Sequence, residues 1–130
     1  MFLVAGLGNP GEEYRFTPHN LGFMTIDRLA AQSGIRVARP DSKALVGAGT
    51  IEGQPVMLAK PITYMNLSGT SLRPLMEKHE LTPRDLILIF DELDLPWRIV
   101  PLCLIFAPDI KNYKHKNCKH YCLHFKNVYV

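Results

Sequence analysis

Two short runs of consecutive apolar residues predict strands that are buried on both faces of a sheet. The first run, Phe2 to Leu7, ends at a Gly-Asn-Pro-Gly turn, and the second, Leu86 to Phe90, ends at Asp91. Between them, the stretches 44–52 and 55–59 flank a central glycine, which predicts a hairpin. The chain therefore alternates strands with segments of a different periodicity.

Two of these intervening segments have apolar residues at helical spacing. The first helix is predicted to begin at Thr17-Pro18, because threonine can cap free amides and proline suits the first helical position, and to stop at Gly34. The second is predicted over Asn66 to His79, with Asn66 or Ser68 near its cap, and Pro74 indicates a first turn or a kink. The apolar stripes are Leu21, Met24, Ile26, Leu29 and Ala30 in the first helix, and Leu72, Leu75 and Met76 in the second. Strands alternating with helices predict an α/β fold in three layers, with a mixed sheet and polar residues at the strand ends.

The charge distribution divides the 130-residue chain near Trp97. Residues 1–97 carry nine basic and eleven acidic side chains, a balance of −2, whereas residues 98–130 carry six and one, a balance of +5. All three cysteines and three of the five histidines also lie in the second part. The apolar content of 47% excludes disorder throughout, and the length suits one domain. We therefore predict an incomplete domain over 1–97 and a divergent basic tail, rich in Cys, His and Lys, over 98–130.

No segment has the pattern of a membrane span or a targeting signal. The run Phe2 to Leu7 has no basic region before it, and the longest later uncharged run, Ile99 to Pro108, falls far short of the ~20 residues that a span needs. The absence of cysteine from residues 1–97 fits a reducing compartment. We expect a soluble cytoplasmic protein that does not contact membranes.

The stretch Gly6 to Gly11 fits the pattern G-x-G-x-x-G after a strand, which by itself suggests a dinucleotide site. In that fingerprint the third glycine opens a helix that receives the pyrophosphate, and an acidic residue follows about 20 positions later. Here Gly11 is followed by Glu12 and Glu13, and the predicted helix begins only at Thr17. Residue 31, about 20 positions after Gly11, is alanine and not an acidic residue. The carboxylates would repel an anionic cofactor, so a dinucleotide site is rejected.

Asn9, His19 and Asp91 are polar residues that a fold of this type can bring to one edge of the sheet. Asn9 follows the first strand, His19 falls in the first turn of the predicted helix, and Asp91 follows the last strand. A carboxylate bound to one imidazole nitrogen fixes the tautomer and raises the basicity of the other nitrogen, which can then deprotonate water. Asn66 can donate to a carbonyl oxygen that gains charge. The pattern predicts hydrolysis of an activated acyl bond.

These residue types also have ordinary structural roles. A histidine in a first helical turn is more often a surface or capping residue than a base, and asparagine serves turns and caps well. A domain without enzymatic activity therefore stays open at this point.

Three blocks of the sequence resemble a known family. The stretch 6–22, GLGNPGEEYRFTPHNLG, is similar to the amino-terminal signature of bacterial-type peptidyl-tRNA hydrolases. The stretch 60–69, KPITYMNLSG, resembles their second signature, and 91–96, DELDLP, resembles the third. Three blocks in the correct order make the resemblance specific.

This resemblance implies an enzyme that hydrolyses the ester between a peptide and the 3′ end of tRNA, and so recycles tRNA from stalled or abandoned translation. His19 corresponds to the general base, Asp91 to the carboxylate that orients it, and Asn9 and Asn66 to amides that hold the ester and help to stabilise the oxyanion. Tyr14 and Met65 match residues that line the site, with Tyr14 near the tRNA terminus. The resemblance implies no metal and no cofactor, peptidyl-tRNA as the partner, and a monomer in an intact family member.

The resemblance covers residues 1–97 and stops at Trp97. Family members continue into another strand, a Gly-Gly-His-Asn-Gly loop, further sheet and a carboxyl-terminal helix. These segments supply much of the basic surface that binds tRNA. A truncated fold with exposed strand edges is expected to self-associate. The competing hypothesis is a catalytically impaired fragment, or an RNA-associated module, that keeps the hydrolase motifs without turnover.

Three interpretations of the tail stay open. Zinc is one, although the spacing of the candidate ligands does not match the usual pairs of ligands; they are His115, Cys118, Cys122 and His124. Contact with tRNA is the second, because five lysines occur together with Tyr113, Tyr121 and Phe125. The third is that the tail is not part of this fold and stems from a frameshift, a retained intron or a faulty gene model, which the abrupt change of composition favours.

Overall fold

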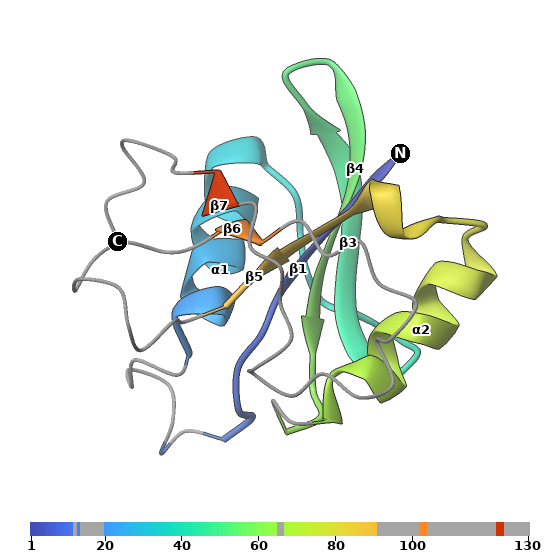
Figure 1. Ribbon diagram of the computed structural model, residues 1–130. Coiled ribbons are helices and arrows are strands. Elements are labelled where there is room, and N and C mark those ends of the chain that lie inside the picture. The colour runs from blue at the N-terminus through green and yellow to red at the C-terminus, as the bar shows by residue number, and fades with distance from the viewer. Residues whose placement is uncertain (12, 14–19, 65–66, 91–101, 104–121, 124–130) are drawn as a thin grey trace.

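The computed structural model describes residues 1–11, 13, 20–64, 67–90, 102–103 and 122–123 (Figure 1). The elements are β1 (Phe2–Gly6), α1 (Leu21–Ser33), β2 (Arg39–Asp41), β3 (Ala44–Ile51), β4 (Gln54–Pro61), α2 (Gly69–Lys78), a 3₁₀ turn (Pro83–Asp85), β5 (Leu86–Ile89), β6 (Leu102–Cys103) and β7 (Cys122–Leu123).

The strands form one mixed sheet in the order β2-β3-β4-β1-β5-β6-β7. Strand β1 lies at its centre and pairs in parallel with both β4 and β5. The hairpin β3–β4 and the short outer strands pair antiparallel. Because β1, β4 and β5 run in the same direction, their carboxyl ends lie at one edge of the sheet, and both helices begin at that edge (Figure 1).

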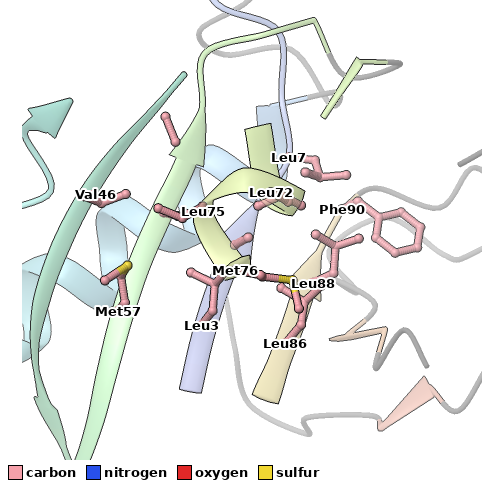
Figure 2. Close-up of a cluster of buried hydrophobic side chains, with 13 residues drawn as sticks. Leu3, Leu7, Val46, Met57, Leu72, Leu75, Met76, Leu86, Leu88 and Phe90 are labelled. Atoms are coloured by element: carbon pink, nitrogen blue, oxygen red, sulfur yellow. The ribbon is translucent and has the colours of Figure 1, made fainter. Parts of the chain in front are cut away.

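Each face of the sheet carries its own apolar core. Leu72, Leu75 and Met76 of α2 point toward the sheet, where they meet residues such as Leu3 and Leu88 (Figure 2). The residues between these on the strands, including Val4, Leu58 and Ile89, point to the other face and pack with Ile26 and Ala30 of α1. Side chains alternate between the faces of a strand, so continuous apolar runs fill both cores. The predicted three-layer α/β arrangement is confirmed.

The predicted elements are present, with differences at their ends. Helix α1 begins at Leu21 and ends at Gly34 in a left-handed conformation, whereas the predicted start at Thr17-Pro18 lies outside the described residues. Of the two interpretations of Pro74, the first helical turn is wrong, because Pro74 is the sixth residue of α2, and the kink stays a prediction. Pro74 lies on the exposed face of the helix, where water can satisfy the carbonyl that loses its donor. Strand β2 was not predicted.

Helix α1 approaches the sheet through two glycines. A Cβ atom on Gly22 would lie 2.6 Å from the carbonyl oxygen of Ile89 and closer still to the backbone of Leu7. A Cβ atom on Gly6 would overlap the Gly22 carbonyl and lie 2.6 Å from Ile26. The first turn of α1 therefore rests directly on the backbones of β1 and β5, where no side chain fits between them.

We predict that Gly22→Ala lowers the free energy of unfolding by about 3 kcal/mol, because the added methyl must push the helix away from two strands. Urea unfolding followed by circular dichroism measures the change. Arg28→Ala, on the exposed face of the same helix, is the control and should change stability by less than about 0.5 kcal/mol. A Gly22→Ala chain as stable as the control would contradict the close approach.

The carboxylate of Asp41, at the end of β2, connects this strand to α2. Its side chain is 4% exposed and accepts from Lys78 Nζ at 3.0 Å. The hydrogen bond from Lys78 is the main cause that lowers the pKa of Asp41 from 3.8 to about 2, against the opposing effect of burial. Because the folded state holds the carboxylate ionised, this contact stabilises the fold fully above about pH 4, and the contribution is lost as the pH falls toward 2.

We therefore predict that the parent chain loses more stability between pH 5 and about pH 2.5 than Asp41→Asn does, since the variant has no carboxylate to protonate. The urea midpoint at the two pH values measures the difference. Asp27→Asn removes a carboxylate whose side chain is 59% exposed and serves as the control, with a loss close to that of the parent. Equal losses in the parent and Asp41→Asn would contradict the assignment.

Candidate active site

The carboxyl ends of β1 and β5 stay together beyond the last paired residues of the strands. The amide of Leu7 donates to the carbonyl oxygen of Ile89 at 2.8 Å. The chain that leaves β1 through Gly8 and Asn9 therefore starts beside the chain that leaves β5 through Phe90, which is 2% exposed. Open α/β sheets place their sites at this carboxyl edge.

Asn20 binds the backbone of Asn9 with both ends of its side-chain amide. The Asn9 amide donates to Asn20 Oδ1 at 2.7 Å, and Asn20 Nδ2 donates to the Asn9 carbonyl at 3.0 Å. Asn20 is 3% exposed and occupies the N-cap position of α1, yet its side chain makes no capping hydrogen bond. The residue thus fastens the turn after β1 to the start of α1 instead of capping the helix.

The glycines of the G-x-G-x-x-G stretch have a packing role here. A Cβ atom on Gly8 would lie 2.7 Å from Asn20 Oδ1 and 2.8 Å from the ring of Phe23. A Cβ atom on Gly6 would overlap the Gly22 carbonyl. Helix α1 begins at Leu21, ten residues after Gly11. The absence of side chains at Gly6 and Gly8 therefore leaves room for helix α1 and for the Asn20 side chain.

Of the predicted site residues, only Asn9 is described by the structure, where it is partly buried. The others lie outside the described residues: Tyr14, His19, Met65, Asn66 and Asp91. Some of their neighbours in the sequence are described: Asn20, which follows His19, is hydrogen-bonded to Asn9, and Ile89, two residues before Asp91, contacts Gly22. Tyr64 and Leu67, which flank Met65 and Asn66, are 57% and 49% exposed.

Asn20 is a residue of this edge whose role the sequence pattern does not predict. The signal was present as an asparagine directly after His19 in the first block, at a helix start where asparagine usually caps. Its partner is the backbone of a residue eleven positions away, and no local pattern identifies a contact of that kind.

The zinc hypothesis for the tail falls almost wholly outside the described residues. His115, Cys118 and His124 are not described, whereas Cys122 lies in β7 opposite Cys103 of β6. Within the described part of the chain, no group of three or more His, Cys, Asp or Glu side chains could hold a metal ion. In the same part, no helix is long and apolar enough to cross a membrane.

We predict that Asn20→Ala lowers the free energy of unfolding by about 2 kcal/mol, because the backbone amide and carbonyl of Asn9 each lose a partner in a partly buried place. Chemical denaturation measures the change. Thr70→Val removes an exposed hydrogen bond to the Leu67 carbonyl and should cost less than about 0.5 kcal/mol. If both variants lose the same small amount, the Asn20 contact does not hold this edge together.

Comparisons with known proteins match about three quarters of this chain to one family. Residues 3–102 match the sequence model of the family described as peptidyl-tRNA hydrolase. A peptidyl-tRNA hydrolase of Solibacter usitatus is 68% identical over 97 residues, which cover 75% of this chain and 50% of that protein. One of Koribacter versatilis is 57% identical over 98 residues, covering 75% and 49%.

A solved structure supports the fold. The crystal structure of peptidyl-tRNA hydrolase from Acinetobacter baumannii matches with a TM-score of 0.70 and 41% identity, over 73% of this chain and 49% of that one. The chain thus spans about half the length of the curated relatives it matches.

Proposed function

Since the chain belongs to the peptidyl-tRNA hydrolase family, we propose that it hydrolyses the ester that joins a peptide to the 3′ end of tRNA. Its partner is then peptidyl-tRNA, its place is translation in the cytoplasm, and its product is tRNA freed from stalled synthesis. The relatives of which it spans about half bear this activity in their names.

In the proposed mechanism His19 is the general base. It takes a proton from water, the resulting hydroxide attacks the ester carbonyl carbon, and the tetrahedral intermediate collapses to a carboxylic acid and the 3′ hydroxyl of tRNA, which receives the proton back from His19. Asp91 orients the imidazole, and Asn9 and Asn66 donate to the carbonyl oxygen as it gains charge. Tyr14 and Met65 line the site. An ester with a ribose leaving group is activated enough for this chemistry without a metal or cofactor.

One observation carries the proposal, namely the contact of Asn20 with Asn9 beside the contact of Gly22 with Ile89. Asn20 follows His19 in the sequence, and Ile89 precedes Asp91 by two residues. These contacts support the proposal because they bring the described neighbours of the proposed base and of its carboxylate to one edge of the sheet.

We predict that the purified chain releases peptide from a peptidyl-tRNA whose peptide is amino-blocked, and that His19→Ala lowers kcat at least ~10²-fold. The rate should rise as the pH increases through the pKa of the base and then level off, because only neutral imidazole accepts a proton. Gln32→Ala, on the exposed surface of α1, is the control and should retain the parent rate.

The assay separates the proposal from its rival. Binding of peptidyl-tRNA without release, in a chain shown to be folded by circular dichroism, would refute the hydrolase and support an RNA-associated module. Release that is unchanged in His19→Ala would refute the assignment of the base.

A further inference from the structure

Several basic side chains gather around the carboxylate of Asp41, in the outermost strand of the sheet. Lys78 Nζ donates to its Oδ1 at 3.0 Å, and Arg39 Nη1 and His79 Nε2 each lie 3.4 Å from its Oδ2. The Asp41 side chain is 4% exposed, whereas those of Arg39 and Lys78 are 57% and 58% exposed. The carboxylate is therefore enclosed, while its cationic partners reach the solvent.

Lys43 adds a positive charge beside this cluster. It is exposed and belongs to the two-residue turn between β2 and β3, in which Ser42 and Lys43 have φ values of 49° and 60°. The amide of Ile62, directly after β4, donates to the Lys43 carbonyl oxygen at 2.9 Å. The backbone of the turn is thus fixed against the end of β4. We call the following four side chains the basic surface: Arg39, Lys43, Lys78 and His79.

The basic surface is positive within a part of the chain that is acidic as a whole. Its three lysine and arginine side chains surround one aspartate, which leaves an excess of two positive charges. Glu80, which follows His79, lowers this excess to one, and Glu77 is paired with Arg73 at 2.8 Å. Residues 1–97 together have a balance of −2. The local excess of positive charge attracts an anionic partner.

The basic surface lies at the same edge of the sheet as the candidate active site. Asp41 pairs with Ala44 of β3, and Ala44 pairs with Pro61 at the carboxyl end of β4. Strand β4 lies beside β1, which leads to Asn9. Strands are ~4.8 Å apart, so the three spacings between β2 and β1 amount to about 14 Å. At ~3.4 Å for each stacked nucleotide of a strand, this distance corresponds to about four nucleotides.

We propose that the basic surface binds phosphates of the RNA strand whose 3′ end occupies the candidate active site, about four nucleotides before that end. The inference rests on the proposed function, which brings the ester-bearing end of tRNA to this edge. Guanidinium and ammonium groups have donors beyond those that one carboxylate uses, and these donors suit phosphate oxygens. Asp41 holds the cations in place without cancelling their charge.

Binding of deacylated tRNA, which carries no ester, tests the proposal without turnover. Fluorescence anisotropy measures Kd on the full chain between about 50 and about 200 mM salt. A double variant, Arg39→Gln with Lys43→Gln, should raise Kd about 10-fold at ~100 mM salt and lower the slope of log Kd against log salt by about 1.5, since each phosphate contact contributes ~0.7 to ~0.9.

The matched control removes the same charge elsewhere. Arg28→Gln with Arg84→Gln changes exposed positions on α1 and on the 3₁₀ turn before β5, and should change Kd by less than about 2-fold. Equal weakening in both double variants would overturn the proposal, because the overall charge and not this surface would then determine binding. Polyglutamate that displaces tRNA from the parent at equal charge would also overturn it, in favour of an acidic protein as the partner.

Circular dichroism checks that the variants fold, since Arg39 contacts Asp41. If the double variant does not fold, Lys43→Glu takes its place, because it leaves the side chains around Asp41 unchanged. This charge reversal should also raise Kd about 10-fold, and an unchanged Kd would overturn the proposal.

A neutral methylphosphonate linkage places the contact along the RNA strand. In a hairpin with a single-stranded 3′ end, one such linkage about four nucleotides from that end should weaken binding to the parent and have no further effect on the double variant. This coupling supports the basic surface even in a parent chain that releases no peptide, where the hydrolase proposal alone has failed. Equal weakening of parent and variant by the linkage would overturn the surface, even in a chain that does release peptide.

Discussion

The structure depends on the direct contact between the first turn of α1 and the backbones of β1 and β5. Gly22 has no side chain, so the helix start settles onto Leu7 and Ile89 at the seam between two parallel strands. Any other residue would lift the helix and open the edge of the sheet. Through this contact, segments from opposite halves of residues 1–90 meet at the edge where the candidate site lies.

Two further sets of hydrogen bonds stabilise the same edge of the sheet. Asn20 gives its amide to the backbone of Asn9, at the expense of capping its own helix. On the opposite face, the Asp41 carboxylate and the carbonyl of Lys43 anchor the segment between β4 and the end of α2. The apolar cores hold each helix on its face, while these polar contacts fix where its ends lie. Apolar burial sets the layers, and directional bonds fix the turn after β1 and the end of α2.

The sequence predicted what depends on local pattern. Continuous apolar runs gave the buried strands, and Gly34 ended α1 as expected. Strand β2 escaped prediction because its three residues, Arg39 to Asp41, are mostly polar, and it exists through pairing with β3. The roles of Asn20 and Asp41 depend on partners eleven and 37 positions away, which only the folded chain brings together. The roles given to His19 and Asp91 stay predictions.

The proposed mechanism requires the carboxylate of Asp91 beside the imidazole of His19. A titration of the His19 ring by NMR, in the parent chain and in Asp91→Asn, tests it most directly, because a neighbouring carboxylate favours the charged imidazolium. We expect the pKa of His19 to be higher in the parent chain than in the variant. The same pKa in both chains would contradict it.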